Sequence, residues 1–256
     1  MRFFSLCLLL MGTLALAGDP TVEEIVAKAN AASYYAGTDG KARVSMVITD
    51  AKGGTRERAF TILRLNGEAG NQKFYVYFEE PADVRKMAFL VWKNAKGDDD
   101  RWLWLPALNL AKRIAPGDKR TSFVGSDFVY EDVSGRGLDE DSHKLLESTD
   151  TQWLLENVPV DTSSVDFSRY TLWIDKKTFL PAKAEYYDKQ NKLFRRVEAL
   201  RVEEIEGIPT VMESKVSDLV TGSSTLNTFT EVGYNLGLDD RIFSERFLRR
   251  PPKEIR

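Results

Sequence analysis

Several stretches of this chain alternate with a period of two residues and are apolar on both alternating faces. From Phe74 to Phe78, phenylalanine and valine alternate with tyrosine, and from Met87 to Trp92 both sets of side chains are apolar. An antiparallel strand normally packs one face and exposes the other to water, which gives an apolar and polar alternation. Strands with two apolar faces must therefore be covered on both sides, or must line a cavity.

The alternation extends from Lys41 to Gly233, and tight turns such as Asp188–Asn191 separate its runs. Short local connections between such runs are typical of an antiparallel meander. The expected N-terminal helix at Thr21–Tyr35 and the short C-terminal one at Asp239–Arg249 cannot cover so much sheet alone. The sequence therefore predicts a mainly β (α+β) fold, a curved antiparallel half-barrel of about 10–11 strands wrapped around an N-terminal helix and short crossover helices.

The N-terminal helix is the best defined of the expected helices. Thr21 is a residue type that caps helix N-termini, and Glu23 and Glu24 suit the positive end of the helix dipole. Ile25 and Ala29 belong to an apolar stripe at helical spacing. At the other end of the chain, residues 249–256 are rich in charge and proline, and we expect them to form a loosely held tail.

The first 17 residues have the composition of a cleaved secretory signal peptide. Arg2 precedes an apolar run that ends in Ala15-Leu16-Ala17, the small residues that signal peptidases recognise. The run is shorter than the roughly 20 residues of a membrane-spanning helix. Gly18, and not a cysteine, follows the expected cut, and Cys7 leaves with the signal. The sequence therefore predicts a signal peptide at 1–17, one domain at 18–256, and a periplasmic protein without disulfides or a lipid anchor.

The residue types of common catalytic sites are scarce. His143 is the only histidine, which excludes metal sites built from several histidines and the HExxH motif. A Ser-His-Asp triad would need His143 with Ser126, and the GxSxG motif that positions such a serine is absent. The run Asp98–Asp100 lacks the spacing of a calcium loop and is interpreted as a solvated turn. The sequence predicts no metal, no cofactor and no catalytic residue. With a net charge of −3 and no basic patch, it predicts no nucleic-acid partner.

One group of carboxylates leaves two interpretations open. Asp127, Glu131 and Asp132 lie close together in the sequence and can form an acid/base or ion site. They can equally cap local turns and pair with nearby basic residues, which are Arg113, Lys119, Arg120 and Arg136. We favour the second interpretation, because no further catalytic motif accompanies the carboxylates.

Two adjacent segments are distinctive: DRWLWLPALNLAKRIAP at Asp100–Pro116 and TSFVGSDFVYEDVSG at Thr121–Gly135. Together with Ala88–Trp92 they resemble the outer-membrane lipoprotein-sorting protein family, whose fold is similar to that of the LolA and LolB carriers. The matching elements are Trp104-Leu105-Pro106, Arg113-Ile114, Phe123, Gly125-Ser126-Asp127-Phe128 and Tyr130-Glu131-Asp132. The resemblance continues to Phe243–Leu248. It implies an incomplete antiparallel barrel around helices, with an apolar cavity for acyl chains.

If such a cavity exists, the aromatic and flexible apolar residues of the two-faced strands are its candidate ligand contacts. These residues are Met46, Phe74, Phe89, Trp102, Trp104 and Phe128. The pattern alone also allows these side chains to fill a packed core, and it does not show which tryptophan faces inward. The segment around Gly125–Phe128 is interpreted as a structural crossover in which Phe123, Phe128 and Tyr130 plug the barrel and Asp127 caps a short turn of helix. The alternative is a gate or a partner surface.

Three functional hypotheses follow from the sequence. The favoured one is a non-enzymatic periplasmic carrier or chaperone, monomeric, that binds acyl chains of a lipid or lipoprotein and works with a membrane transporter in envelope trafficking. The second is an accessory module of an envelope export complex, with a packed core and no cargo. The third is a hydrolase that uses Asp127, Glu131 or Asp132, and the absence of catalytic motifs makes it the weakest.

Overall fold

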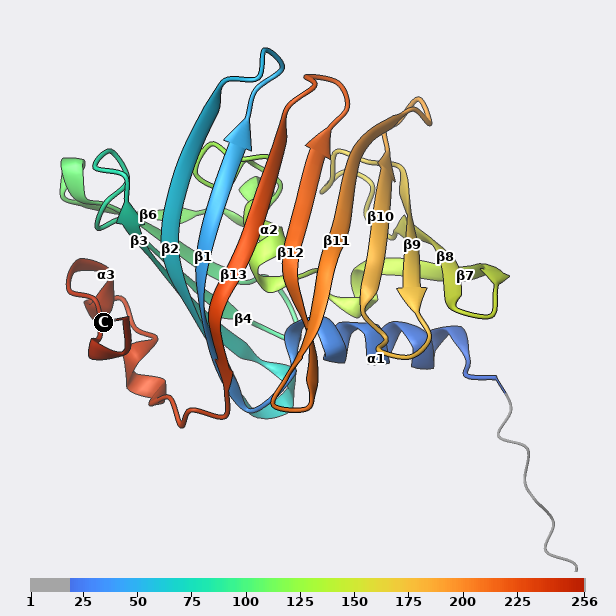
Figure 1. Cartoon of the computed structure of the whole chain (residues 1–256), viewed down its shortest axis with the longest axis horizontal. Helices are drawn as coiled ribbons and strands as arrows, with labels where there is room; N and C mark the ends of the chain where they lie inside the picture. Colours follow the sequence, from blue (N-terminus) through green and yellow to red (C-terminus); the bar gives the residue numbers. More distant parts are fainter. Residues whose placement is uncertain (1–18, 256) are drawn as a thin grey trace, which may run out of the picture.

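A computed structural model describes residues 19–255 of the chain. These residues form one curved antiparallel sheet of 13 strands in the order β6-β5-β4-β3-β2-β1-β13-β12-β11-β10-β9-β8-β7 (Figure 1). The strands are β1 (Asp39–Thr49), β2 (Thr55–Asn66), β3 (Gln72–Glu80), β4 (Ala88–Lys93), β5 (Asp100–Leu105), β6 (Leu110–Ile114), β7 (Asp141–Ser148), β8 (Gln152–Pro159), β9 (Arg169–Asp175), β10 (Pro181–Tyr187), β11 (Leu193–Ile205), β12 (Ile208–Asp218) and β13 (Ser224–Tyr234).

The sheet consists of two meanders joined side by side. β1–β6 and β7–β13 each pair strands that follow one another in the chain, and β1 pairs with β13 to join the two halves. A crossover of residues 115–140 connects β6 to β7 and contains the short helix α2 (Tyr130–Ser134). Two 3₁₀ turns, Pro116–Asp118 and Leu138–Glu140, flank α2. The predicted fold class, an antiparallel half-barrel, is confirmed.

Helix α1 (Val22–Tyr34) lies across the concave side of the sheet (Figure 1). The Thr21 hydroxyl accepts a hydrogen bond from the Glu24 backbone amide at 3.2 Å, and the Glu24 carboxylate accepts one from the Thr21 amide at 2.9 Å. This reciprocal capping box satisfies two amides that a helix N-terminus leaves free. Ile25 and Ala29 are buried against strands β8 and β9. The predicted helix and its cap are therefore confirmed.

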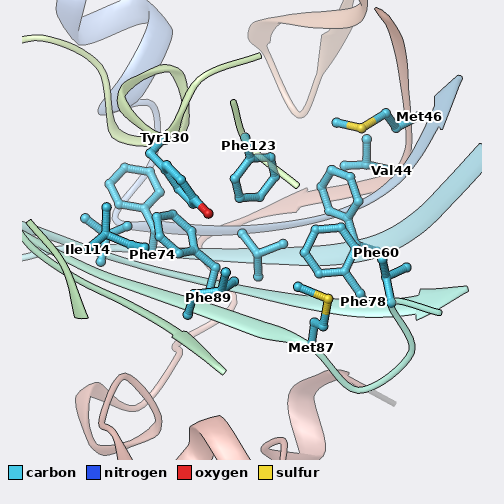
Figure 2. Packing of buried hydrophobic residues seen from close by; sticks show 14 of the residues in the cluster. Val44, Met46, Phe60, Phe74, Phe78, Met87, Phe89, Ile114, Phe123 and Tyr130 are labelled. Atoms are coloured by element: carbon cyan, nitrogen blue, oxygen red, sulfur yellow. The ribbon is translucent and has the colours of Figure 1, made fainter. Parts of the chain in front are cut away.

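The concave face of β1–β6 carries an aromatic core that the crossover completes (Figure 2). Phe123 of the crossover contacts Phe78, Phe89 and Tyr130, with ring centroids 5.8, 5.4 and 5.6 Å away. Phe60 packs on Phe78 at 5.1 Å. Because the crossover supplies the rings that fill this half of the barrel, it acts as a plug, as the sequence pattern indicated for Phe123 and Tyr130.

The C-terminal segment covers the opposite face of the same strands. It contains a 3₁₀ turn (Asp240–Ile242), helix α3 (Arg246–Arg249) and a last 3₁₀ turn (Lys253–Ile255). Its buried residues Phe243 and Leu248 pack with Tyr75 and Leu90 of β3 and β4. The Tyr75 hydroxyl donates to the carbonyl of Phe247 at 2.7 Å. Strands β3–β5 are therefore apolar on both faces because each face has its own cover.

Three sequence expectations change with the structure. The sheet has 13 strands and not 10–11, because the short segments at both of its edges also pair. The expected helix at Asp239–Arg249 is broken into a 3₁₀ turn and α3. The prediction of a loosely held tail at residues 249–256 is wrong. Pro252 and Ile255 are buried, and the Lys41 ammonium donates to the carbonyl of Glu254 at 2.7 Å. The expected signal peptide at 1–17 lies outside the described residues and stays a prediction.

Candidate functional site

A cavity of about 490 Å³ lies between helix α1, the crossover and the concave face of the sheet. This volume falls within the range of pockets that bind small ligands. Apolar side chains from every wall contribute to it: Val26 and Ala29 of α1, Met46 of β1, Phe60 and Ile62 of β2, Phe74 and Val76 of β3, Phe123, Phe128 and Val133 of the crossover, Leu172 of β9, Val197 and Ala199 of β11, and Phe229 of β13. The cavity is thus an apolar space in the interior of the half-barrel.

The structure separates the six predicted ligand contacts into two groups. Met46, Phe74 and Phe128 line the cavity. Phe89 lies on the same face of the sheet, where the rings of Phe123 and Tyr130 cover it at 5.4 and 5.1 Å, and it is not part of the cavity wall.

Trp102 and Trp104 lie on the opposite face of the sheet from the cavity. They belong to the cluster under the C-terminal segment, where the Arg249 guanidinium lies over the Trp104 ring at 5.1 Å. Trp102 packs against Trp92 with ring centroids 4.8 Å apart. Neither tryptophan contributes to the cavity wall, because the pleat of β5 directs both side chains away from the crossover.

The crossover is anchored to the sheet by Asp127. Its carboxylate accepts hydrogen bonds from the hydroxyls of Ser223 and Thr225, at 2.5 and 2.6 Å, and its backbone amide donates to the Thr225 hydroxyl at 3.0 Å. The expectation that Asp127 caps a short helix is wrong, since its carboxylate reaches the start of β13. Asp132 has that role, because its carboxylate accepts from the Val129 amide before α2 at 2.8 Å.

Glu131 lies at the centre of a buried ionic network between the crossover and the second half of the sheet. Its side chain is 3% exposed and meets three cations: Lys119 Nζ and Arg136 Nη1 at 3.0 Å each, and Arg120 Nη1 at 3.3 Å. The predicted pairing of this carboxylate with local basic residues is therefore confirmed for these three. Arg113 pairs with Asp100 instead.

The network continues from Arg136 to strand β9. Arg136 donates from Nε and Nη2 to both oxygens of Asp141, at 3.0 and 2.9 Å, and the Tyr170 hydroxyl donates to Asp141 at 2.9 Å. Burial alone lowers the pKa of Arg136, but the carboxylates of Asp141 and Glu131 outweigh it and hold that pKa above its ordinary value. The charged side chains in this wall of the cavity are therefore paired with one another, and these ion pairs fix the position of the crossover.

Glu140 makes this network sensitive to pH. Burial raises the pKa of Glu140, but the hydrogen bond from Lys119 and the charge of Arg136 hold the pKa below its ordinary value of 4.5. A carboxyl group with a lowered pKa stabilises the fold above its unfolded-state pKa, and this contribution is lost as the pH falls through the folded-state value. We expect Glu140→Gln to lower the urea midpoint at pH 7, with the gap to wild type narrowing below pH 4.5. An equal gap at every pH would contradict this role.

The remaining sequence candidates do not form a catalytic arrangement. His143 Nδ1 lies 2.7 Å from the Asn157 amide oxygen and Nε2 lies 3.1 Å from the carbonyl of Leu138, while the Ser126 hydroxyl donates to the carbonyl of Phe123. Residues 19–255 contain no group of three or more His, Cys, Asp or Glu side chains that lie close enough together to hold a metal ion.

The expected solvated turn at Asp98–Asp100 is only partly correct. Asp99 is 10% exposed and pairs with Arg101 at 2.7 Å, and burial raises its pKa. Its carboxylate also accepts from the Ser134 hydroxyl at 3.1 Å, so Asp99 helps to hold the end of α2.

Sequence reasoning missed the contribution of the later strands to the cavity. Ser214 of β12 and Asn227 of β13 lie opposite one another in the sheet and line the cavity with Ala199 of β11. A signal was present in the sequence. Asn227 alternates with Phe229 on the inward face of β13, and a polar residue in an inward set is unusual unless it has a partner.

The curved sheet, the helix on its concave side and the apolar cavity between them define a half-barrel of the LolA type. The chain is 27% identical to an outer membrane lipoprotein-sorting protein domain from Vibrio parahaemolyticus, with a TM-score of 0.82 over 89% of this chain and 98% of that one. A LolA superfamily protein from Nitrosomonas europaea, 20% identical, has the same fold, with a TM-score of 0.70 over 90% of this chain and 100% of that one.

A family assignment follows from two further matches. The chain is 30% identical to a DUF1329 family protein from Desulfovibrio piger, with a TM-score of 0.81 over 88% of this chain and 97% of that one. A family model described as "Uncharacterized protein" matches residues 70–250. The chain belongs to the DUF1329 family, and its resemblance to lipoprotein-sorting proteins is confirmed. No curated protein matches the chain.

Proposed function

We propose that this protein is a non-enzymatic carrier or chaperone that binds acyl chains of a lipid or lipoprotein in the cavity of the half-barrel. The observation that carries the proposal is the apolar cavity between α1, the crossover and the concave face of the sheet. The similarity to a lipoprotein-sorting protein domain supports a role in trafficking lipids or lipoproteins to the outer membrane.

The physical reason for such a carrier is the cost of exposing an acyl chain to water. At ~0.8 kcal/mol per methylene, a chain of about 16 carbons costs on the order of 12 kcal/mol to expose. An apolar cavity removes most of that barrier and needs no catalytic group. Met46, Phe74 and Phe128 are the proposed contacts, and the unbranched Met46 side chain adapts to ligands of different shape.

The proposed setting is the periplasm, reached with the signal peptide at 1–17, and the proposed partner is a membrane transporter that supplies or accepts the ligand. Within residues 19–255, none of the helices has the length and apolar character that a bilayer crossing requires. We propose that the protein acts as a monomer.

The direct test is to find the ligand. The mature protein is purified from cells, extracted with solvent and examined by mass spectrometry, and the extracted protein is titrated with a fluorescent fatty acyl probe. Co-purified lipid together with probe binding is the expected result. A protein that carries no lipid and binds no probe, but is recovered in crosslinks to an envelope complex, would favour the accessory-module hypothesis instead.

Filling the cavity is expected to abolish binding. Ala199 of β11 lines the cavity, and Leu200, the next residue, is 51% exposed. Leu200 lies in a β-bulge between β11 and β12, where simple alternation does not hold, but its exposure shows that it faces solvent. Ala199→Trp therefore places an indole in the cavity, while Leu200→Trp places it outside. We expect Ala199→Trp to weaken binding of the acyl probe by tenfold or more (~1.4 kcal/mol or more) and Leu200→Trp to leave it unchanged. Equal affinities for folded variants would place the ligand elsewhere.

A further inference from the structure

Asn227 is a buried polar side chain without a partner in the wall of the cavity. It is 6% exposed, and its Oδ1 atom accepts no hydrogen bond within residues 19–255. In the sheet it lies between Met46 of β1 and Ser214 of β12, and all three residues line the cavity. An amide oxygen buried without a hydrogen bond costs stability, so a side chain of this kind needs a role that compensates for the cost.

The surroundings of Asn227 indicate the chemistry of its partner. Thr225, two residues earlier on the same strand, and Ser223 both donate to the carboxylate of Asp127. That carboxylate disfavours an anionic group close by. The ionic groups of the crossover, Glu131 and Arg136, are already paired with one another. An amide oxygen only accepts, so its partner must be a donor. Burial of a charged donor among the apolar side chains of the cavity is costly, so an uncharged hydrogen-bond donor on the ligand is the group that suits Asn227 Oδ1.

We infer that Asn227 is a hydrogen-bonding anchor for a hydroxyl or amide N–H carried on the aliphatic ligand of the cavity. The inference rests on the proposed function and makes it more specific. The apolar walls hold the chain of the ligand, while Asn227 selects ligands with an uncharged donor at a fixed depth in the cavity. Selection of this kind is strong because a ligand without the donor leaves the buried oxygen unpaired.

Two matched pairs of competitors test the anchor, each displacing a fluorescent fatty acyl probe from the purified protein. Dodecanamide is compared with N,N-dimethyldodecanamide, which lacks the N–H, and 1-decanol with decyl methyl ether, which lacks the O–H. For wild type we expect each donor to compete about tenfold better than its partner, as one hydrogen bond predicts. In Asn227→Leu the ratio should fall to about one, and the variant without ligand should gain thermal stability because the unpaired amide is gone. Leu200→Ala, a change at an exposed position of β11 outside the cavity, should retain the wild-type ratio.

The possible outcomes separate the two proposals. If the probe does not bind wild type, the proposed function fails and the anchor fails with it. If the probe binds but wild type does not distinguish donors from their partners, or Asn227→Leu keeps the wild-type ratio, the anchor alone is overturned. Loss of thermal stability in Asn227→Leu without ligand would also overturn it, since that result would make Asn227 a structural residue.

Discussion

Replacing Glu131 by glutamine is expected to destabilise the fold by about 3–5 kcal/mol, because it removes the one anion that three buried cations share. The substitution keeps the size of the side chain, so no cavity contributes to the loss. It leaves Lys119, Arg120 and Arg136 with only their second partners, which are Glu140, Asp166 and Asp141. Three largely buried charges thus lose part of their compensation at once, which is costly.

The effect should appear first in the crossover. Glu131 lies in the first turn of α2, and the same segment places Phe123 and Tyr130 in the aromatic core. Loosening the network therefore weakens both the plug and one wall of the cavity. We expect a lower urea midpoint and a faster hydrogen exchange of the α2 amides in Glu131→Gln than in wild type.

A matched control is Glu147→Gln, because Glu147 is exposed on β7. This variant should unfold within about 0.5 kcal/mol of wild type. The same experiment separates the carrier from the hydrolase hypothesis. A Glu131→Gln variant of undiminished stability that loses a hydrolytic activity would support the hydrolase, and would show that the ion pairs of Glu131 contribute little to the fold.

Much of the fold could be predicted because its determinants are local. The period of two in the side chains of β1–β13 follows directly from the pleat of each strand. The two capping residues of α1 lie only three positions apart. The double apolar pattern of β3–β5 also showed correctly that both faces need a cover. Each of these features depends on neighbouring residues in the chain, which a single sequence displays directly.

The orientation of the two-faced strands could not be predicted in the same way. When both faces of a strand are apolar, the pattern is nearly symmetrical, and only a distant segment decides which face meets the cavity. For Trp102 and Trp104 that segment is the C-terminal one, which contributes Phe243 and Leu248 more than 100 residues later. The sequence predicted a short helix for the part that carries Phe243 and Leu248 and a loose tail for residues 249–256, but it did not show that this segment packs on the sheet.

The ionic network was predicted in part for a related reason. Lys119, Arg120 and Arg136 lie near Glu131 in the sequence, so their ion pairs with Glu131 could be predicted. The hydroxyl of Tyr170 reaches Asp141 from a strand 29 positions away, and Asn227 meets Met46 only because β1 pairs with β13. Contacts between strands that do not follow one another in the chain depend on the topology, which a periodic pattern does not specify.

Replacing Gly135 by alanine is expected to destabilise the protein by about 2–5 kcal/mol through two separate costs. Gly135 ends α2 at φ 75° and ψ 162°, a conformation that is nearly restricted to glycine. A methyl group there would also lie 2.7 Å from the Cε2 and Cζ atoms of the Tyr34 ring. This glycine is the point at which the crossover contacts the last turn of α1, so the substitution separates two walls of the cavity.

The Tyr34 ring has little freedom to move away. The Lys93 ammonium lies 5.4 Å from the ring centroid and donates to the carbonyl of Ser134 at 2.6 Å, which holds the end of α2 against the ring. The ring also lines the cavity, so this space is the direction left to it, and a rigid ring gives way less easily than the free end of a flexible side chain.

Two other glycines separate the backbone cost from the clash. Gly53 has φ 83° with nothing within 4 Å of an added Cβ, so Gly53→Ala measures the backbone cost alone, while Gly117 has open space and no positive φ and should tolerate alanine. We expect the urea midpoint to be highest for Gly117→Ala, lower for Gly53→Ala and lowest for Gly135→Ala. Adding Tyr34→Leu to Gly135→Ala should recover part of the lost stability. If Gly135→Ala were no worse than Gly53→Ala, α1 and the crossover would not be held in close contact at this point.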